Sequence, residues 1–205
     1  MADSTKTHEI HRVEEITGRP AYRRLLEEMN GDPEGRRLLR ERPELSSELV
    51  DYDALRRLPP TTLGGAYVRH LDGNGITADY QAARTRHVED EQMAYLMRRF
   101  RQTHDVWHAL LGLGILGHEE VVIHAFSYGQ LRLPVSAMIM TFGTLKHIVM
   151  ERRWGALRHS LREAYDVGRA AEPLLKVIWE EQWADPIDEV RVRYGVRVLE
   201  RRYLD

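Results

Sequence analysis

A short polar stretch, T-H-D-V-W-H, contains the residues whose types and spacing best suit metal chemistry. It places His104, Asp105 and His108 close together, and a further carboxylate, Glu120, follows downstream. If the stretch is helical, each residue turns the side-chain direction by about 100°, so the first three side chains share about a third of the circumference. Two imidazoles and two carboxylates offer nitrogen and oxygen ligands to a divalent ion such as zinc, iron or manganese.

The two halves of this set must be brought together by a turn. In one straight helix Glu120 would lie about 18 Å beyond His108, too far away to share an ion. Three glycines lie between them, at positions where a helix can end and the chain can change direction: Gly112, Gly114 and Gly117. We therefore expect one helix to carry the histidines and a second, starting near Gly117, to return Glu120 to them.

The flanking sequence predicts helices on both sides of the motif. Residues 89–103 show apolar residues at helical spacing and lead directly into it, and residues 134–150 form the most hydrophobic helical stretch. No alternating pattern supports a sheet. We expect an all-α, single-domain helical bundle with the metal site between two consecutive helices.

The expected organisation has four parts, which differ in composition. They are a flexible N-terminal segment (1–18), an N-terminal helical appendage (19–57), a helical core (58–196) and a C-terminal tail (197–205).

Local signals mark several helix boundaries. Asp32-Pro33 provides a cap followed by a proline at the first helical position. Ser46 or Ser47 is predicted to cap a helix that runs to Leu58, and residues 170–183 are predicted to be helical.

Composition narrows the class of protein. The chain has 205 residues, 42% hydrophobic and 30% charged, with a net charge of −2. This balance suits a globular protein and gives no general argument for nucleic-acid binding. The absence of cysteine excludes disulfides and thiol catalysis. No apolar run approaches the roughly 20 residues of a membrane span, and the first residues resemble neither a secretory signal nor a transit peptide. We expect a cytoplasmic protein.

With these residues identified, the chain resembles the coenzyme Q (ubiquinone) biosynthesis protein 4 family, whose signature is H-D-x-x-H, eleven residues and E. Three further blocks look like segments of that family. They are L-P-P-T-T-L-G-G-A-Y at 58–67, E-D-E-Q-M-A-Y-L-M-R-R-F-R-Q-T-H-D at 89–105 and D-P-I-D-E-V-R-V-R-Y-G-V at 185–196. The resemblance extends over residues 58–196.

The resemblance implies an all-helical, often dimeric protein that binds a divalent ion, usually described as zinc. By position the ligands would be His104, Asp105, His108 and Glu120. It also implies a role in ubiquinone biosynthesis, in decarboxylation or oxidative decarboxylation of a polyprenylated aromatic precursor. The implied partners are an isoprenoid or quinone-like lipid, a second copy of the chain, other quinone-pathway proteins and a membrane surface.

A polyprenyl substrate needs an apolar wall. We expect the helix at 134–150 to supply it, through Met138, Phe142 and Leu145. His124, in contrast, is predicted to be a core or surface histidine, and Glu119 to face solvent.

Two alternatives remain open. The first is a non-catalytic scaffold that binds lipid or a quinone intermediate and keeps the metal for structure. The second is a metal phosphohydrolase of the His-Asp type, because H-D-V-W-H is similar to the His-Asp pair of those all-α enzymes. That class needs further ligands from other helices, for which His70 and His87 are the candidates.

Overall fold

The computed structural model describes residues 4–79, 85, 88–151 and 154–200. Within these residues the fold is all-α, as predicted, and the β-type pairing there is one isolated bridge between Thr62 and Pro186. In chain order the helices are α1 (Ser4–Thr17), α2 (Arg19–Gly31), α3 (Pro33–Glu41), α4 (Tyr52–Arg56), α5 (Leu63–Asn74), α6 (Glu91–Leu111), α7 (Gly117–Leu131), α8 (Pro134–Glu151), α9 (Trp154–Ala170) and α10 (Ile187–Tyr194), with 3₁₀ turns η2 (Leu174–Lys176) and η3 (Trp179–Glu181) before the last.

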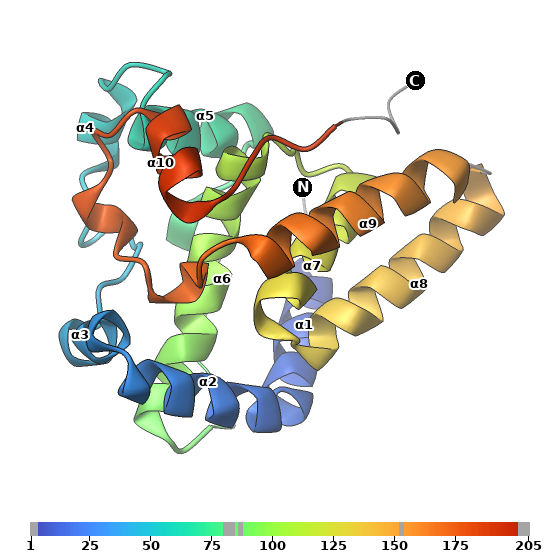
Figure 1. The fold of residues 1–205 in the computed structure, drawn as a ribbon, viewed down its shortest axis with the longest axis horizontal. Helices are drawn as coiled ribbons and strands as arrows, with labels where there is room; N and C mark the ends of the chain where they lie inside the picture. The colour runs from blue at the N-terminus through green and yellow to red at the C-terminus, as the bar shows by residue number, and fades with distance from the viewer. Residues whose placement is uncertain (1–3, 80–84, 86–87, 152–153, 201–205) are drawn as a thin grey trace.

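Helix α6 runs through the middle of the molecule and carries the histidine motif. Figure 1 shows α4, α5 and α10 on one side of it and α7, α8 and α9 on the other. Asp90 caps its first turn by accepting a hydrogen bond from the Met93 amide (3.0 Å), and most of its length is buried. Because α6 is packed on nearly every side, side chains that point away from it are held in protein interior.

Two of the N-terminal helices, α2 and α3, share this core. Residues 4–17, expected to be flexible, form α1, and α2 and α3 contribute Tyr22 and Leu38 to the same cluster of buried residues. Asp32 caps α3 by accepting hydrogen bonds from the amides of Glu34 (2.7 Å) and Gly35 (3.2 Å), which confirms the predicted helix start. The division of the chain at residues 57 and 196 stays a prediction.

One predicted helix starts later than expected, and a second predicted helix does not form. Neither Ser46 nor Ser47 caps a helix, because Ser47 binds Asp79 through its amide and hydroxyl, and α4 starts at Tyr52 with Asp51 as its cap.

Residues 170–183 form only the end of α9 and the two short turns η2 and η3. There the Val177 carbonyl accepts a hydrogen bond from the buried Arg99 guanidinium (2.9 Å), and Pro173 interrupts any helix continuing from α9. The segment is held by tertiary contacts that local sequence does not reveal.

Candidate metal centre

Two consecutive helices position the four predicted ligands. Helix α6 continues through His104, Asp105 and His108 and ends at Gly112, whose φ of 68° is the left-handed conformation that glycine adopts easily. Helix α7 begins at Gly117 and places Glu120 in its first turn. The Nε2 atom of His108 and the Oε1 atom of Glu120 are 3.5 Å apart, so the turn does return the carboxylate to the histidines.

Glu119 fixes the path of the connecting loop. Its carboxylate accepts hydrogen bonds from the backbone amides of Gly114 (2.9 Å) and Leu116 (3.1 Å). A Cβ atom at Gly114 would lie 2.5 Å from Oε2 of Glu119. The loop can therefore approach this carboxylate so closely only because residue 114 is a glycine. Glu119 is therefore buried, contrary to the prediction that it faces solvent. Its role is to set where α7 starts, and so where Glu120 points.

The ligand atoms form two overlapping groups that share His104. In one group, ligand atoms of His104, Asp105 and His108 lie within 4.8 Å of one another. The second group joins His104 to Glu120 and His124 within the same distance. The contact between His108 and Glu120 connects the two groups, so the structure brings all four predicted residues together and adds a fifth.

His124 is the residue that sequence reasoning missed. It follows Glu120 by one helical turn, with the same i, i+4 spacing that relates His104 to His108. Its ring lies 5.4 Å from the ring of His104, and its Nδ1 lies 3.3 Å from the Ser136 hydroxyl. The repeated spacing was the available signal. The spacing indicates a candidate ligand only when α7 is known to face α6.

Burial keeps two of the histidines neutral. Burial, together with the neighbouring ring of His104, lowers the pKa of His124 to about 3. Burial also lowers the pKa of His108 well below its usual value, with the His104, His70 and His124 rings adding to the effect. A neutral imidazole is the form that binds a metal ion, so both side chains are ready to serve as ligands without losing a proton.

His104 and Glu120 respond differently to the same surroundings. Burial by itself lowers the pKa of His104, but the Asp105 carboxylate, 3.8 Å from Nδ1, and the charge of Glu120 outweigh it and raise that pKa. Burial raises the pKa of Glu120, although about a third of its side chain is exposed. Both residues thus hold a proton more readily than usual, and a cation binding here would displace it.

The donor set fits a divalent cation. Nε2 of His104 is buried and has no hydrogen-bond partner among the described residues, and Nε2 of His108 makes only the 3.5 Å contact with Glu120. Burying a polar atom without a hydrogen-bond partner costs free energy, and a bound ion would remove that cost. Imidazole nitrogens together with carboxylate oxygens are a ligand set typical of zinc, iron and manganese.

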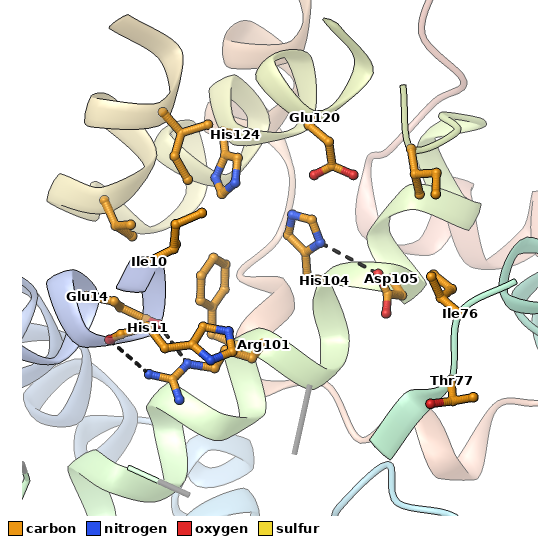
Figure 2. Close-up of a pocket in the computed structure, with 14 residues that line it drawn as sticks. Ile10, His11, Glu14, Ile76, Thr77, Arg101, His104, Asp105, Glu120 and His124 are labelled. Atoms are coloured by element: carbon orange, nitrogen blue, oxygen red, sulfur yellow. Dashed lines mark hydrogen bonds and ion pairs between the residues drawn. The ribbon is translucent and has the colours of Figure 1, made fainter. Parts of the chain in front are cut away.

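A cavity of about 310 Å³ opens beside this centre. Figure 2 shows His104, Asp105, Glu120 and His124 around one part of it, with residues of α1 on the opposite side. Its apolar lining comes from several elements: Ile10, Ile76, Phe100, Ile115, Val135 and Ile139. The volume lies at the lower end of the range for small-molecule sites, about 300–1,000 Å³. It suits a single aromatic ring better than a long chain.

The predicted tail residues lie elsewhere on α8. Met138, Phe142 and Leu145 are 38%, 66% and 56% exposed, and none of them lines the cavity. It is Val135 and Ile139 that α8 contributes to the lining.

Of the two histidines predicted as further ligands of a phosphohydrolase, His70 lies in the described part of the chain. The ring of His70 stacks on the ring of His108 at 5.0 Å, and burial lowers its pKa, but it belongs to neither ligand group. His87 lies outside the described residues.

Comparison with known proteins identifies a family. The sequence model of the family described as "Coenzyme Q (ubiquinone) biosynthesis protein Coq4" matches residues 1–200. The chain is 36% identical over 163 residues to "Ubiquinone biosynthesis protein coq4, mitochondrial" of Pyrenophora tritici-repentis, which covers 77% of this chain and 53% of the relative. It is 34% identical over 187 residues to the COQ4 homolog of Drosophila sechellia, which covers 91% of this chain and 69% of the relative.

A solved structure has a similar fold. The crystal structure of a candidate ubiquinone biosynthesis protein from Nostoc punctiforme matches with a TM-score of 0.69 and 25% identity, over 85% of this chain and 81% of that chain.

The relatives also allow a comparison of chain length and of cellular location. The chain spans about half the length of the first of these relatives. Both relatives are named as mitochondrial, so the predicted cytoplasmic location stays a prediction. None of the helices in the described part of the chain combines the length and apolar content that a membrane span requires.

Proposed function

Because the chain belongs to the coenzyme Q (ubiquinone) biosynthesis protein Coq4 family, we propose that it acts in ubiquinone biosynthesis as a metal-dependent decarboxylase. The substrate would be a prenylated aromatic acid, whose bond between ring and carboxylate breaks to release CO₂ while a proton takes its place on the ring carbon. In the oxidative form of the reaction a hydroxyl takes its place at the expense of an external oxidant. The observation that carries this proposal is the convergence of His104, His108 and Glu120 beside a cavity the size of one ring.

The metal would be held by His104, Asp105, His108 and Glu120, with His124 as a further candidate. A zinc, iron or manganese ion bound there supplies positive charge that attracts a carboxylate or phenolate oxygen and stabilises negative charge on it. Within the protein, the Asp105 carboxylate lies near Nδ1 of His104, which leaves the opposite nitrogen, Nε2, for a ligand. Phe100 and Ile115 line the cavity and would pack against the faces of an aromatic ring.

A long isoprenoid tail does not fit in about 310 Å³ and would have to leave the cavity. Helix α8 offers a route, because Val135 and Ile139 line the cavity while Met138, Phe142 and Leu145 continue along the exposed surface of the same helix. We propose that this surface contacts the tail or the lipid that surrounds it. The same surface could meet a second copy of the chain or another quinone-pathway protein.

The scaffold alternative differs from the enzyme in one measurable respect. A scaffold would bind the prenylated ligand without converting it, and the metal would only support the fold. The phosphohydrolase alternative has less support, because both ligand groups in the described part of the chain come from α6 and α7 alone.

The test is release of CO₂ from a prenylated hydroxybenzoate, with the purified protein loaded in turn with Zn²⁺, Fe²⁺ or Mn²⁺. We expect release with at least one metal and loss of release in His104→Ala, while circular dichroism shows the helical content unchanged. Binding without CO₂ release, tested with and without dioxygen, would support the scaffold instead. Release of phosphate from nucleotides would revive the phosphohydrolase.

A further inference from the structure

Helix α1 covers one side of the candidate cavity. Ile10, His11 and Glu14 all line it, opposite the residues that α6 and α7 contribute. Figure 2 shows α1 approaching the cavity from one side, with Arg101 of α6 reaching toward it. The first helix of the chain therefore forms a wall of a site whose other residues lie far along the sequence.

This wall is held in place by buried ion pairs. Nε of Arg101 donates to Oε2 of Glu14 (2.8 Å), and Nη2 of the same guanidinium donates to Oε1 of Glu15 (3.3 Å). The other oxygen of Glu14 accepts a short hydrogen bond from the Tyr22 hydroxyl. The side chains of Arg101, Glu14 and Glu15 are at most 5% exposed. Arg101 precedes His104 by one turn of α6, so these pairs act directly beside the candidate ligands.

The apolar residues of α1 contribute much less to its attachment. In the part of α1 whose side chains are described, Ile10 is 42% exposed, Ile16 is 58% exposed and Val13 is half-buried, whereas the fully buried side chains are polar. Burying an ion pair desolvates both charges, so its net contribution to stability is small compared with that of a packed apolar face. A helix attached in this way can separate from the body at a lower cost than α6 or α7.

A single residue separates α1 from α2. Gly18 lies between the two helices and donates its amide hydrogen to the Glu14 carbonyl (2.8 Å). A Cβ atom there would lie 2.6 Å from that carbonyl oxygen. Gly18 is itself helical (φ −79°, ψ −16°), and its carbonyl accepts a hydrogen bond from the Tyr22 amide (2.9 Å). Movement of α1 would therefore break hydrogen bonds at this junction, while α2 stays anchored in the core through Tyr22 and Leu25.

We propose that α1 is a lid over the candidate metal centre, latched by the pairing of Arg101 with Glu14 and Glu15, and that ligands enter when the latch opens. Arg101 is then a positioning residue, which acts by holding α1 against the cavity that its own side chain also lines. The lid serves the site of the proposed function, but the movement is a property of the fold and can be measured without metal or substrate.

The absence of cysteine makes the test direct, because any introduced thiol is the single one in the chain. Val135 lines the cavity and is 4% exposed, so Val135→Cys reports access to the cavity. Val106→Cys, fully buried in the core and outside the cavity, reports global unfolding. Each probe is combined with Arg101→Gln or Glu14→Gln, and the rate of reaction with a maleimide is measured on the full chain.

We expect both latch variants to label the Val135→Cys thiol faster, by about tenfold for each 1.4 kcal/mol that the latch contributes. The Val106→Cys thiol should label at an unchanged rate. Arg101→Lys keeps one charge and should restore an intermediate rate. Equal labelling of Val135→Cys with and without the latch, or equal acceleration of both probes, would overturn the proposal.

A matched control comes from the neighbouring buried arginine. Arg99 is fully buried and pairs with Glu180 at 2.6 Å, on a side of α6 that does not line the cavity. Arg99→Gln should therefore reduce stability without accelerating Val135→Cys relative to Val106→Cys. Because metal-free protein is used, failure of the lid and failure of the proposed metal-dependent activity are separate results.

Discussion

The Nε2 atom of His108 lies 3.5 Å from the Oε1 atom of Glu120, although the two residues belong to different helices. This contact joins the two candidate ligand groups that share His104. It depends on the left-handed Gly112 and on the Glu119 carboxylate that holds the loop, neither of which is a candidate ligand. The centre is thus as much a property of the turn between α6 and α7 as of the residues that would bind an ion.

Glu120→Gln tests whether the second helix contributes to metal binding. We expect it to weaken Zn²⁺ affinity by at least about tenfold, because an amide lacks the charge of a carboxylate. Competition with a chromogenic chelator measures this. His124→Ala should also weaken binding if the second group contributes. His70→Ala removes a ring that stacks on His108 without belonging to either group, and should have the smallest effect. Unchanged affinity in both Glu120→Gln and His124→Ala would confine the site to α6.

Gly112→Ala tests the turn itself. Its φ of 68° is unfavourable for any residue with a side chain, and a Cβ atom would lie 2.9 Å from a methyl group of Val198. We expect the free energy of unfolding to fall by roughly 1–2 kcal/mol, measured by urea denaturation.

The control is Gly73→Ala, which lies within α5 and where a Cβ atom would have nothing within 4 Å. This substitution should be neutral, or stabilising by up to about 1 kcal/mol. A similar loss in both variants would mean that the turn at Gly112 is not under special constraint.

Predictions from the sequence were most accurate where they depended only on neighbouring residues. The i, i+4 pair of histidines, the glycines after them and the cap at Asp32 each depend on neighbouring residues, and the corresponding helix starts and ends lie where they were expected. The 3₁₀ turns at η2 and η3 were missed because Arg99, distant in sequence, binds the Val177 carbonyl.

The two site residues that were not predicted also depend on contacts between segments that are distant in the sequence. His124 becomes a candidate ligand only because α7 faces α6, and Glu14 lines the cavity only because Arg101 holds α1 there. A polar N-terminal segment gives no apolar periodicity from which this attachment could be predicted.

Asp32 gives a prediction about pH. The hydrogen bond from Lys176, 2.6 Å from Oδ2, and those from the capped amides lower the pKa of Asp32 below its usual 3.8. A carboxylate with a lowered pKa stabilises the folded state above its unfolded pKa, and this contribution is lost as pH falls through the folded pKa. Asp32→Asn keeps a capping side chain and removes the charge.

We expect Asp32→Asn to be less stable than the native chain at pH 6, by roughly 0.5–1 kcal/mol because the pair is partly exposed to solvent. The difference should shrink once the pH falls below 3.8. Urea denaturation across this range provides the comparison. A difference that stays constant down to pH 3 would show that the charge of Asp32 does not contribute.

The most direct test of the metal centre is the metal content of the purified protein, measured by inductively coupled plasma mass spectrometry. The native chain is compared with the double variant His104→Ala/His108→Ala and with His159→Ala, a control in an exposed histidine of α9. We predict about one divalent ion per chain in the native protein and the control, and almost none in the double variant. Equal metal content in all three, or none in the native chain after incubation with Zn²⁺, Fe²⁺ and Mn²⁺, would contradict a metal centre formed by α6 and α7.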